Sequence, residues 1–176
     1  MKAWYRWNGR VWQEDTTNSI LQLVKAVARS YGDAASKLKD TDPLQKPLLK
    51  WSALSEGLRS MQATVTLAQS DPDICVDAKE FDRDPMLLTV ENGTLDLDTG
   101  KFRLFDTHDR ITHWAPVTYV KGEVSTVWDS FLQTIIPDPD TRRFIQTAVG
   151  YSLTGSMRED KMFILYGDGR NGKTTF

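Results

Sequence analysis

Cysteine and histidine are scarce in this sequence of 176 residues, which contains one cysteine, Cys75, and two histidines, His108 and His113. A single cysteine excludes an internal disulfide, and so few sulfur and nitrogen ligands exclude a zinc site of the usual spacing. The sequence also lacks an apolar run long enough to span a membrane, and its first residues lack the apolar stretch of a signal peptide. These absences predict a cytoplasmic protein with no membrane partner.

A strong net charge is absent as well, because 22 Lys and Arg residues nearly balance 24 Asp and Glu residues to give a formal net charge of -2. The field of the whole chain therefore provides no general attraction to nucleic acid, so any DNA site must be local. Basic residues gather in two stretches, with Lys46, Lys50 and Arg59 in one and Arg142, Arg143, Arg158 and Lys161 in the other. Dispersed charges of this kind are usually solvated surface, and we prefer this interpretation to a polyanion groove.

Apolar residues are plentiful, since 40% of the residues are hydrophobic and six are tryptophan. This composition predicts a packed core, because disordered chains have too little apolar surface to offset the entropy lost on ordering. The length allows one ordinary domain and the beginning of a second.

The first half of the chain predicts a β-hairpin followed by helices. Aromatic-rich runs flank Asn8-Gly9, the strongest short-range signal for a hairpin. Residues 15–18 offer N-caps for a helix whose apolar positions recur at helical spacing and which we expect Gly32 to end. After Pro47, apolar residues at steps of three and four predict either one long helix or two helices that meet near Gly57.

A small sheet is predicted in the middle of the chain. Apolar residues alternate with polar ones in residues 86–90, 94–97 and 101–105, and Asn-Gly and Asp-Thr-Gly turns separate these runs. This pattern predicts a three-stranded β-meander. Residues 117–120 are a candidate for a further strand.

Two helices are predicted after this sheet. Residues 125–126 offer caps for a helix that Pro137 ends, and Asp138 caps the next one. The apolar residues between 144 and 149 predict a buried stripe, and the helical region runs up to Gly155. Together these elements predict an α+β fold, with a mixed helical and β-meander N-terminal domain.

A phosphate-binding loop is predicted at residues 167–174, Gly-Asp-Gly-Arg-Asn-Gly-Lys-Thr. The apolar run at residues 162–166 leads into it and predicts a buried strand of a parallel sheet. Glycines let backbone N–H groups approach a triphosphate, and Lys173 adds a cation for the β and γ phosphates. Thr174 offers a hydroxyl to Mg²⁺. A glycine-rich hairpin would explain the glycines but not the Gly-Lys-Thr sequence.

The predicted cofactors are therefore ATP and Mg²⁺, with Lys173 as the catalytic residue and Thr174 as the metal ligand. The predicted cofactor-binding residues are Gly167, Asp168, Gly169, Arg170, Asn171, Gly172, Lys173, Thr174 and Thr175. Hydrolysis also needs an acidic motif on a neighbouring strand, a group that positions water and usually an arginine from a partner. No positions after Phe176 can provide them, so we expect a sequence truncated from a longer protein and no ATPase turnover from this part alone.

Four segments occur in the order and spacing of a known family: residues 81–85, 91–100, 149–155 and 167–176. They read Phe-Asp-Arg-Asp-Pro, Glu-Asn-Gly-Thr-Leu-Asp-Leu-Asp-Thr-Gly, Val-Gly-Tyr-Ser-Leu-Thr-Gly, and the phosphate-binding loop extended by Thr-Phe. The chain resembles the phage, plasmid and poxvirus-type primase-helicase family of superfamily three DNA helicases. The tryptophan-rich opening is similar too, so the resemblance covers nearly the whole chain.

This resemblance implies that residues 1–155 are the N-terminal domain and that residues 156–176 begin a truncated α/β AAA+-like ATPase core. It implies an ATP-dependent DNA helicase of phage, plasmid or mobile-element replication, in the cytoplasm of a bacterial host or phage-infected cell. Copies of the parent would form a hexameric ring around single-stranded DNA or a replication fork. Asn171 is typical of the group, whereas Thr174 stands where the family often has serine. Members of this family commonly carry a primase domain upstream, and the resemblance of these 176 residues does not extend to one.

Two other functions stay open. One is another P-loop NTPase or kinase, and the other is a non-enzymatic interaction or oligomerisation module formed by the isolated chain. The hairpin tryptophans Trp4, Trp7 and Trp12, close to Arg6 and Arg10, have faces on which single-stranded DNA could stack. Cross-strand packing is the preferred interpretation, because tryptophans in hairpins usually pair in this way.

Acidic residues also suggest a metal site at first sight, because Asp82, Asp84, Asp96 and Asp98 lie close together in the sequence. Turn chemistry explains them better, since aspartate side chains bond to the backbone two residues ahead. The two histidines have no partners at ligand spacing, so we interpret them as surface or structural residues.

Overall fold

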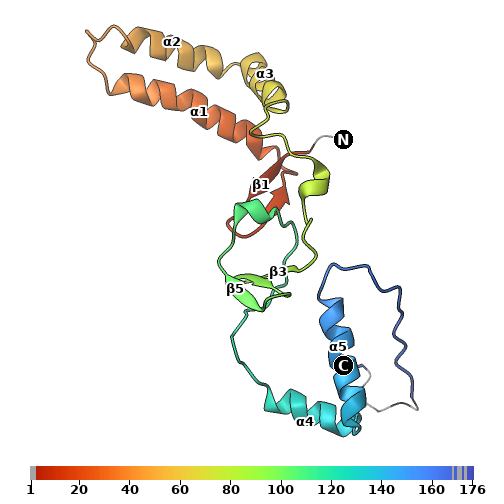
Figure 1. Cartoon of the computed structure of the whole chain (residues 1–176). Coiled ribbons are helices and arrows are strands. Elements are labelled where there is room, and N and C mark those ends of the chain that lie inside the picture. The colour runs from red at the N-terminus through yellow and green to blue at the C-terminus, as the bar shows by residue number, and fades with distance from the viewer. Residues whose placement is uncertain (1–2, 168, 170–171, 173) are drawn as a thin grey trace. The chain divides into compact units, whose positions relative to one another are not determined.

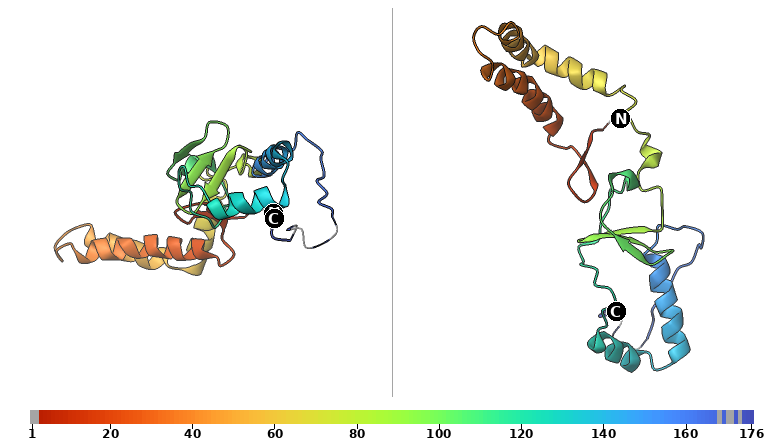
Figure 2. Two further views of the ribbon diagram at one scale, coloured as in Figure 1. Left: turned by 90° about the horizontal axis from the view of Figure 1, so that it is seen from below. Right: turned by 60° about the vertical axis from the view of Figure 1, so that its left-hand side comes forward.

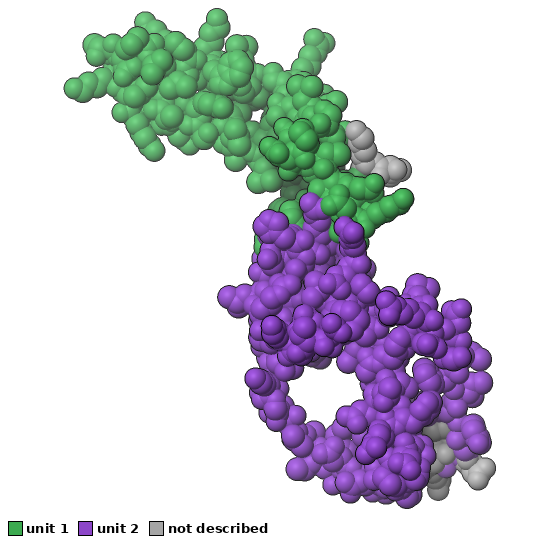
Figure 3. Space-filling model, in the orientation of Figure 1, with its two compact units in different colours: residues 1–8, 12–81 green, residues 9–11, 82–176 purple. Residues whose placement is uncertain are grey.

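An α+β architecture is present in the computed structural model of the chain, which describes residues 3–167, 169, 172 and 174–176. In this part of the chain, five α-helices accompany a two-stranded and a three-stranded antiparallel sheet (Figure 1). The chain divides into two compact units, residues 1–8 with 12–81 and residues 9–11 with 82–176 (Figure 3). The predicted combination of helices and a β-meander is confirmed.

The N-terminal hairpin is confirmed in unit 1. Strand β1 (Tyr5–Trp7) pairs antiparallel with β2 (Trp12–Glu14), and Trp7 lies opposite Trp12. The loop therefore covers residues 8–11 rather than Asn8-Gly9 alone. The ring centroids of Trp7 and Trp12 are 5.9 Å apart, and the ring of Trp12 lies edge-on to Phe81 at 6.4 Å. These rings pack across the hairpin, as the preferred interpretation predicts.

Helix α1 (Ser19–Ser36) begins where the carboxylate of Asp15 accepts hydrogen bonds from backbone N–H groups. Its Oδ1 accepts from Ser19 at 2.8 Å and its Oδ2 accepts from Ile20 at 2.9 Å. These donors belong to the first helical turn and have no partner within the helix. Because the bonds favour the charged carboxylate, they lower the pKa of Asp15 to about 2.

The prediction that Gly32 ends this helix is wrong, because α1 continues to Ser36. Gly32 instead marks a close approach of α1 to α2 (Gln45–Ser55), where a Cβ on residue 32 would lie 3.0 Å from Ser52 Oγ. Ala28 and Ala35 on α1 and Ser52 on α2 are all buried. Small residues thus allow the two helices to lie side by side (Figures 1 and 2).

Two helices, rather than one long helix, occupy residues 45–68. Helix α2 begins before Pro47, which lies in its first turn, where the missing N–H has little cost. Gly57 is extended, with φ of -63° and ψ of 137°, and α3 (Leu58–Ala68) begins directly after it. Of the two alternatives, the pair of helices that meet near Gly57 is confirmed.

The β-meander is confirmed in unit 2. Strands β3 (Leu87–Val90), β4 (Gly93–Asp96) and β5 (Lys101–Arg103) pair antiparallel in that order. Thr89 and Thr94 face each other across β3 and β4 with their hydroxyl oxygens 3.2 Å apart, and both are buried. Gly93 leaves no room for a side chain, because a Cβ there would lie 2.4 Å from the carbonyl oxygen of Arg103.

Residues 117–120 do not form a strand, although the segment that contains them forms backbone hydrogen bonds with β3 and with the turn after it. The N–H of Ala115 donates to Thr89 O at 2.9 Å, and the N–H of Glu91 donates to Val117 O at 2.9 Å. The ladder is interrupted because the N–H of Val117 donates to Ala115 O at 2.8 Å. Pro116 between them has no N–H to offer. The candidate strand is thus replaced by an irregular segment.

The two C-terminal helices and their caps are confirmed. Helix α4 (Thr126–Ile135) begins with Ser125 Oγ accepting from the N–H of Trp128 at 3.2 Å. Helix α5 (Pro139–Ser152) begins with Asp138 Oδ2 accepting from the N–H of Thr141 at 2.8 Å. Arg142 on α5 donates to the carbonyl oxygens of Ile136 and Pro137 at 2.6 and 2.7 Å. This arginine therefore satisfies carbonyl groups that α4 leaves open at its C-terminal end.

The apolar stripe predicted for α5 is present but is not buried. Phe144 is 61% exposed and Val149 is 46% exposed, and the helix ends at Ser152. One contact on this face is Phe163, whose ring centroid lies 6.1 Å from that of Phe144. The helices of the described residues include none that combines the length and the apolar character needed to cross a bilayer.

Gly93→Ala should destabilise unit 2, because the new methyl group would overlap the backbone of β5. We expect a loss of about 1–3 kcal/mol in the free energy of unfolding, the usual cost of overpacking. Gly150→Ala is the matched control, since a Cβ on this α5 residue meets nothing within 4 Å. The free energy of unfolding of that variant should rise by up to about 1 kcal/mol, because alanine has the higher helix propensity. Urea unfolding followed by circular dichroism measures both, and equal effects of the two variants would contradict this account.

Asp15→Asn should reduce the pH dependence of stability. The pKa of Asp15 is lowered in the folded state to about 2, so its contribution is present above the unfolded pKa and is lost as the pH falls through about 2. We expect the variant to unfold at lower urea concentration at neutral pH and to match the wild type near about pH 2. The difference should persist at about 1 M salt, because short hydrogen bonds are screened less than distant charges. If the difference in unfolding free energy between the variant and the wild type were the same at all pH values, Asp15 would have no such role.

Candidate nucleotide-binding site

The predicted phosphate-binding loop is described at some of its positions. Gly169 and Gly172 have φ values of 90° and 79°, in the left-handed region that glycine adopts readily and other residues rarely adopt. A Cβ on Gly169 would meet nothing within 4 Å, so the backbone there is open to approach. The glycines of the motif are therefore required by the backbone conformation. Asp168, Arg170, Asn171 and Lys173, also predicted for this site, lie outside the described residues.

Residues 174–176 are held close to Gly172 by a turn. The N–H groups of Thr175 and Phe176 both donate to Gly172 O at 3.0 Å. Thr174 and Thr175, predicted as a metal ligand and a phosphate contact, are both exposed.

This turn packs against α4. A Cβ on Gly172 would lie 2.8 Å from Ile135 Cγ2 and 3.1 Å from Phe131 Cζ. The ring of Phe176 is nearly parallel to that of Trp128, with centroids 6.0 Å apart and an interplanar angle of 16°. Apolar contacts at Gly172 and at Phe176 thus hold this turn against α4.

A cleft of about 460 Å³ lies between α4 and α5, next to this turn. Its apolar walls are Trp128, Leu132, Ile136, Pro139, Ile145, Val149 and Phe176. Its polar walls are Asp129, Gln133, Arg142, Arg143 and Gln146. The volume lies within the range of small-molecule sites. Motif reasoning missed this cleft, because its walls come from residues that no local pattern connects.

The strand predicted before the loop is absent. Residues 161–167 are irregular and exposed, and Met162 and Tyr166 are 82% and 91% exposed. A central strand needs hydrogen bonds from strands on either side, and none of the described segments pairs with this one. The apolar run therefore has no sheet to join among the described residues.

Two of the four acidic residues, Asp84 and Asp96, accept from backbone N–H groups just ahead of them, as turn chemistry predicts, whereas Asp82 bonds to a distant segment. Asp96 Oδ1 accepts from the N–H groups of Asp98 and Thr99 at 3.0 Å each, and the bond from Thr99 is the main cause of the lowered pKa of Asp96. Asp84 Oδ1 accepts from the N–H of Met86 at 2.9 Å. Asp82 Oδ1 accepts from the more distant Thr112 N–H at 2.7 Å. No group of three or more potential metal ligands occurs among the residues that the structure describes.

The two histidines lie on the surface, as predicted. His108 Nδ1 lies 2.8 Å from Asp106 Oδ1, and His113 Nε2 lies 3.9 Å from Asp82 Oδ2. The histidine side chains are 92% and 90% exposed. The bond from the N–H of His108 is the main cause of the lowered pKa of Asp106. The His108 contact belongs to a local turn, whereas the His113 contact joins two segments that are distant in the sequence.

The basic residues that sequence analysis singled out belong to both units, and Arg142 and Arg143 lie on α5 in unit 2. Lys46, Lys50 and Arg59 are exposed on α2 and α3 in unit 1. In unit 2 the guanidinium of Arg10, which belongs to the hairpin loop, lies 4.0 Å from the ring centroid of Trp114. This cation–π contact occupies one face of Trp114. It was not predicted, because the two residues are far apart in the sequence.

Known proteins share sequence with most of the chain. A family model described as "D5 N terminal like" matches residues 1–137. A protein of Acanthamoeba polyphaga mimivirus, provisionally named helicase L207/L206, is 31% identical over 100 residues, which are 54% of this chain and 10% of that protein. Two African swine fever virus proteins, provisionally named primase C962R, are each 31% identical to this chain over 100 residues. They come from the Warthog/Namibia/Wart80/1980 isolate and the Badajoz 1971 Vero-adapted strain. The matched residues are 53% of this chain and 10% of each viral protein. The match thus spans 10% of the length of each of these relatives.

Gly172→Ala should disturb the packing of the loop on α4, whereas Gly169→Ala should not. Both residues have positive φ, so the backbone strain of the two variants is similar. Only at Gly172 would the new methyl group overlap Ile135 and Phe131. We expect a shift of the Ile135 methyl resonances in the first variant and none in the second, measured by NMR on methyl-labelled protein. Equal shifts in the two variants would contradict the contact.

Proposed function

The chain belongs to the D5 N-terminal-like family, and from this premise we propose that it is part of an ATP-dependent DNA helicase that acts in DNA replication. The names of the viral relatives, a helicase and a primase, support a replicative primase-helicase. The Gly-Asp-Gly-Arg-Asn-Gly-Lys-Thr sequence supports use of a nucleoside triphosphate. This phosphate-binding motif, on a chain of this family, is the observation that carries the proposal.

The proposed ATP site uses the backbone and three side chains of the loop. Backbone N–H groups around Gly169 and Gly172 would hold the phosphates, because glycine leaves them accessible. Lys173 would neutralise charge on the β and γ phosphates, and the hydroxyl of Thr174 would bind Mg²⁺. Thr175 would add a phosphate contact. Mg²⁺ supplies charge neutralisation and orients the phosphates when bound.

The described residues fit this assignment. Gly169 has open space around its α-carbon, and the conformations of Gly169 and Gly172 exclude bulkier residues. Thr174 and Thr175 present exposed side chains. Mg²⁺ prefers oxygen ligands, and the hydroxyl of an exposed threonine can provide one. A core of AAA+ type would follow in the parent protein.

We also propose that the parent protein binds single-stranded DNA or a replication fork as a hexameric ring of identical subunits. The helicase and primase names of the relatives support DNA as the partner. The ring is an inference from the primase-helicase resemblance of the chain. The proposed compartment is the cytoplasm of a cell that carries the replicating element.

Lys173→Ala should weaken binding of Mg-ATP by about tenfold to a hundredfold, the range expected when one hydrogen bond to a charged group is lost. The measurement is isothermal titration calorimetry on the 176-residue chain. Lys161→Ala is the matched control, because Lys161 is an exposed lysine just before the loop. It should bind ATP like the wild type.

Two threonine variants test the Mg²⁺ assignment in the same experiment. Thr174→Ser keeps the hydroxyl and should keep the dependence of ATP binding on Mg²⁺, whereas Thr174→Ala should lose it. Wild-type chain that binds no ATP with or without Mg²⁺ would refute the assignment of this loop.

A further inference from the structure

The helix pair α1–α2 in unit 1 has two sides of different chemistry. The two helices run antiparallel, and small residues such as Ala28, Gly32 and Ser52 lie where they meet (Figures 1 and 2). A residue that directly precedes a contact residue lies about 100° around its helix. Because the helices run in opposite directions, the preceding residues of both helices lie on the same side of the pair.

Large apolar residues occupy this side. On α1, Val27 and Tyr31 directly precede Ala28 and Gly32. On α2, Trp51 directly precedes Ser52, and Leu54 and Leu44 lie one and two helical turns from it. The five side chains are between 38% and 61% exposed, so the described part of the chain leaves them uncovered. This set is the α1–α2 face: Val27, Tyr31, Leu44, Trp51 and Leu54.

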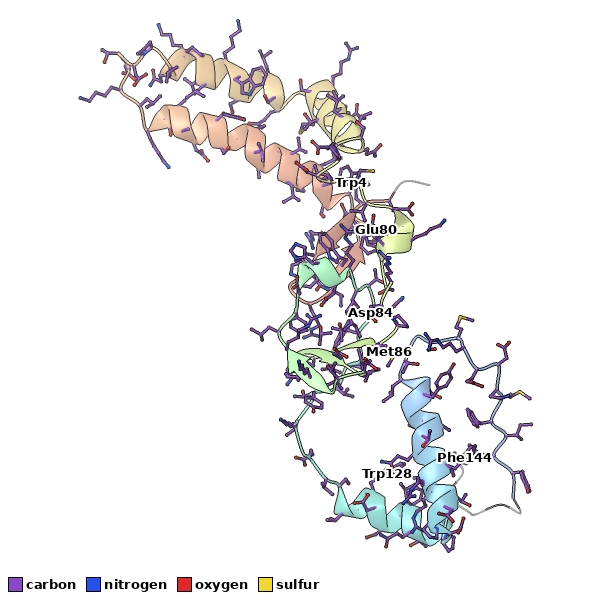
Figure 4. The ribbon with its side chains drawn as sticks, viewed as in Figure 1. Trp4, Glu80, Asp84, Met86, Trp128 and Phe144 are labelled. Atoms are coloured by element: carbon purple, nitrogen blue, oxygen red, sulfur yellow. The ribbon has the colours of Figure 1, made fainter. Side chains whose placement is uncertain are left out.

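Charged residues occupy the opposite side. Arg29 and Glu56 each directly follow a residue of the helix contact, and their Nε and Oε2 atoms lie 3.2 Å apart. Lys46 is exposed on the same side. Figure 4 shows side chains that point outward from both helices of the pair. The pair thus has one side suited to water and another suited to burial, and an apolar stripe of this kind usually packs on another element.

We propose that the α1–α2 face is a docking site for an amphipathic helix of a partner protein, with an apolar stripe and acidic flanks. Contiguous apolar surface is uncommon on proteins that act alone and marks protein-binding sites. Such sites accept helices whose apolar residues recur at steps of three and four. Trp51 and Tyr31 are of the residue types that contribute most to protein contacts.

Basic residues at the borders of the face favour an acidic partner. Lys50 lies four residues before Leu54, and Lys37 lies three residues after the exposed Ala34, which directly precedes the buried Ala35. Both lysines are exposed. Residues 19–69 contain seven basic and four acidic residues, which give a net charge of +3. An acidic helix complements this charge, whereas a second copy of the helix pair would bring like charges together.

The probe for this site is a synthetic peptide of about 18 residues, five helical turns, with leucines at steps of three and four and glutamates beside them. Its binding to the 176-residue chain is measured by fluorescence anisotropy. A second peptide has lysine in place of every glutamate. We expect the glutamate peptide to bind at least about tenfold more tightly, because its charge is complementary. This preference should decrease at about 1 M salt.

Four variants locate the binding side. Leu54→Ala should weaken binding of the glutamate peptide by about tenfold, the effect of losing a largely buried leucine side chain. Leu49→Ala is the matched control, since Leu49 is an exposed leucine of α2 that directly follows a contact position on the charged side. It should leave the affinity unchanged. Lys50→Glu should weaken binding severalfold, whereas Lys46→Glu, with the same change in net charge, should not.

Several outcomes would overturn the proposal. The first is that the wild-type chain binds neither peptide, or that Leu54→Ala and Leu49→Ala have equal effects. The second is a dimer, seen by analytical ultracentrifugation, that Leu54→Ala converts to a monomer, because a second copy would then occupy the face. The third is Leu54-dependent binding to phosphatidylglycerol vesicles without peptide binding, which would assign the face to lipid. ATP takes no part in these measurements, so their result is independent of the proposed nucleotide site.

Discussion

Hydrogen bonds from backbone N–H groups to aspartate carboxylates fix the turns on which this chain depends. Carboxylates accept from N–H groups two to five residues ahead at eight positions among the described residues: Asp15, Asp42, Asp71, Asp77, Asp84, Asp96, Asp106 and Asp138. The need for such bonds follows from the small core. The buried hydrophobic residues are Val11, Ala28, Ala35, Val90 and Ile111. With little apolar burial, local polar bonds define where several elements begin, among them α1, β3 and α5.

These bonds explain why much of the local structure could be predicted. An aspartate or serine before a helix acts within three to five residues, so Ser125 and Asp138 could be recognised from the sequence alone. The Asp96 turn between β4 and β5 is local in the same sense. The hairpin around Gly9 and the meander could be predicted for this reason. Each depends on groups that are neighbours in the sequence.

Elements that depend on a distant partner could not be predicted in this way. Gly32 looks like a helix end, and only the position of Ser52 on another helix reveals that it permits close packing. Residues 117–120 have strand composition, but the bond from Val117 N–H to Ala115 O interrupts their pairing with β3. The apolar run at 162–166 has the composition of a buried strand, yet a strand exists only where a second backbone pairs with it. The composition of a segment indicates whether it could be buried, but not which other segment lies beside it.

The candidate site combines both kinds of information. A phosphate-binding loop could be predicted from glycines, lysine and threonine in the sequence, whereas the cleft could not, because its walls lie on two separate helices and at Phe176. Gly172 connects the two. Its positive φ sets the direction of the loop, and its lack of a side chain allows the loop to contact Ile135. Since one residue satisfies both constraints, a shift of α4 against Gly172 would move the backbone at which the proposed function places a phosphate.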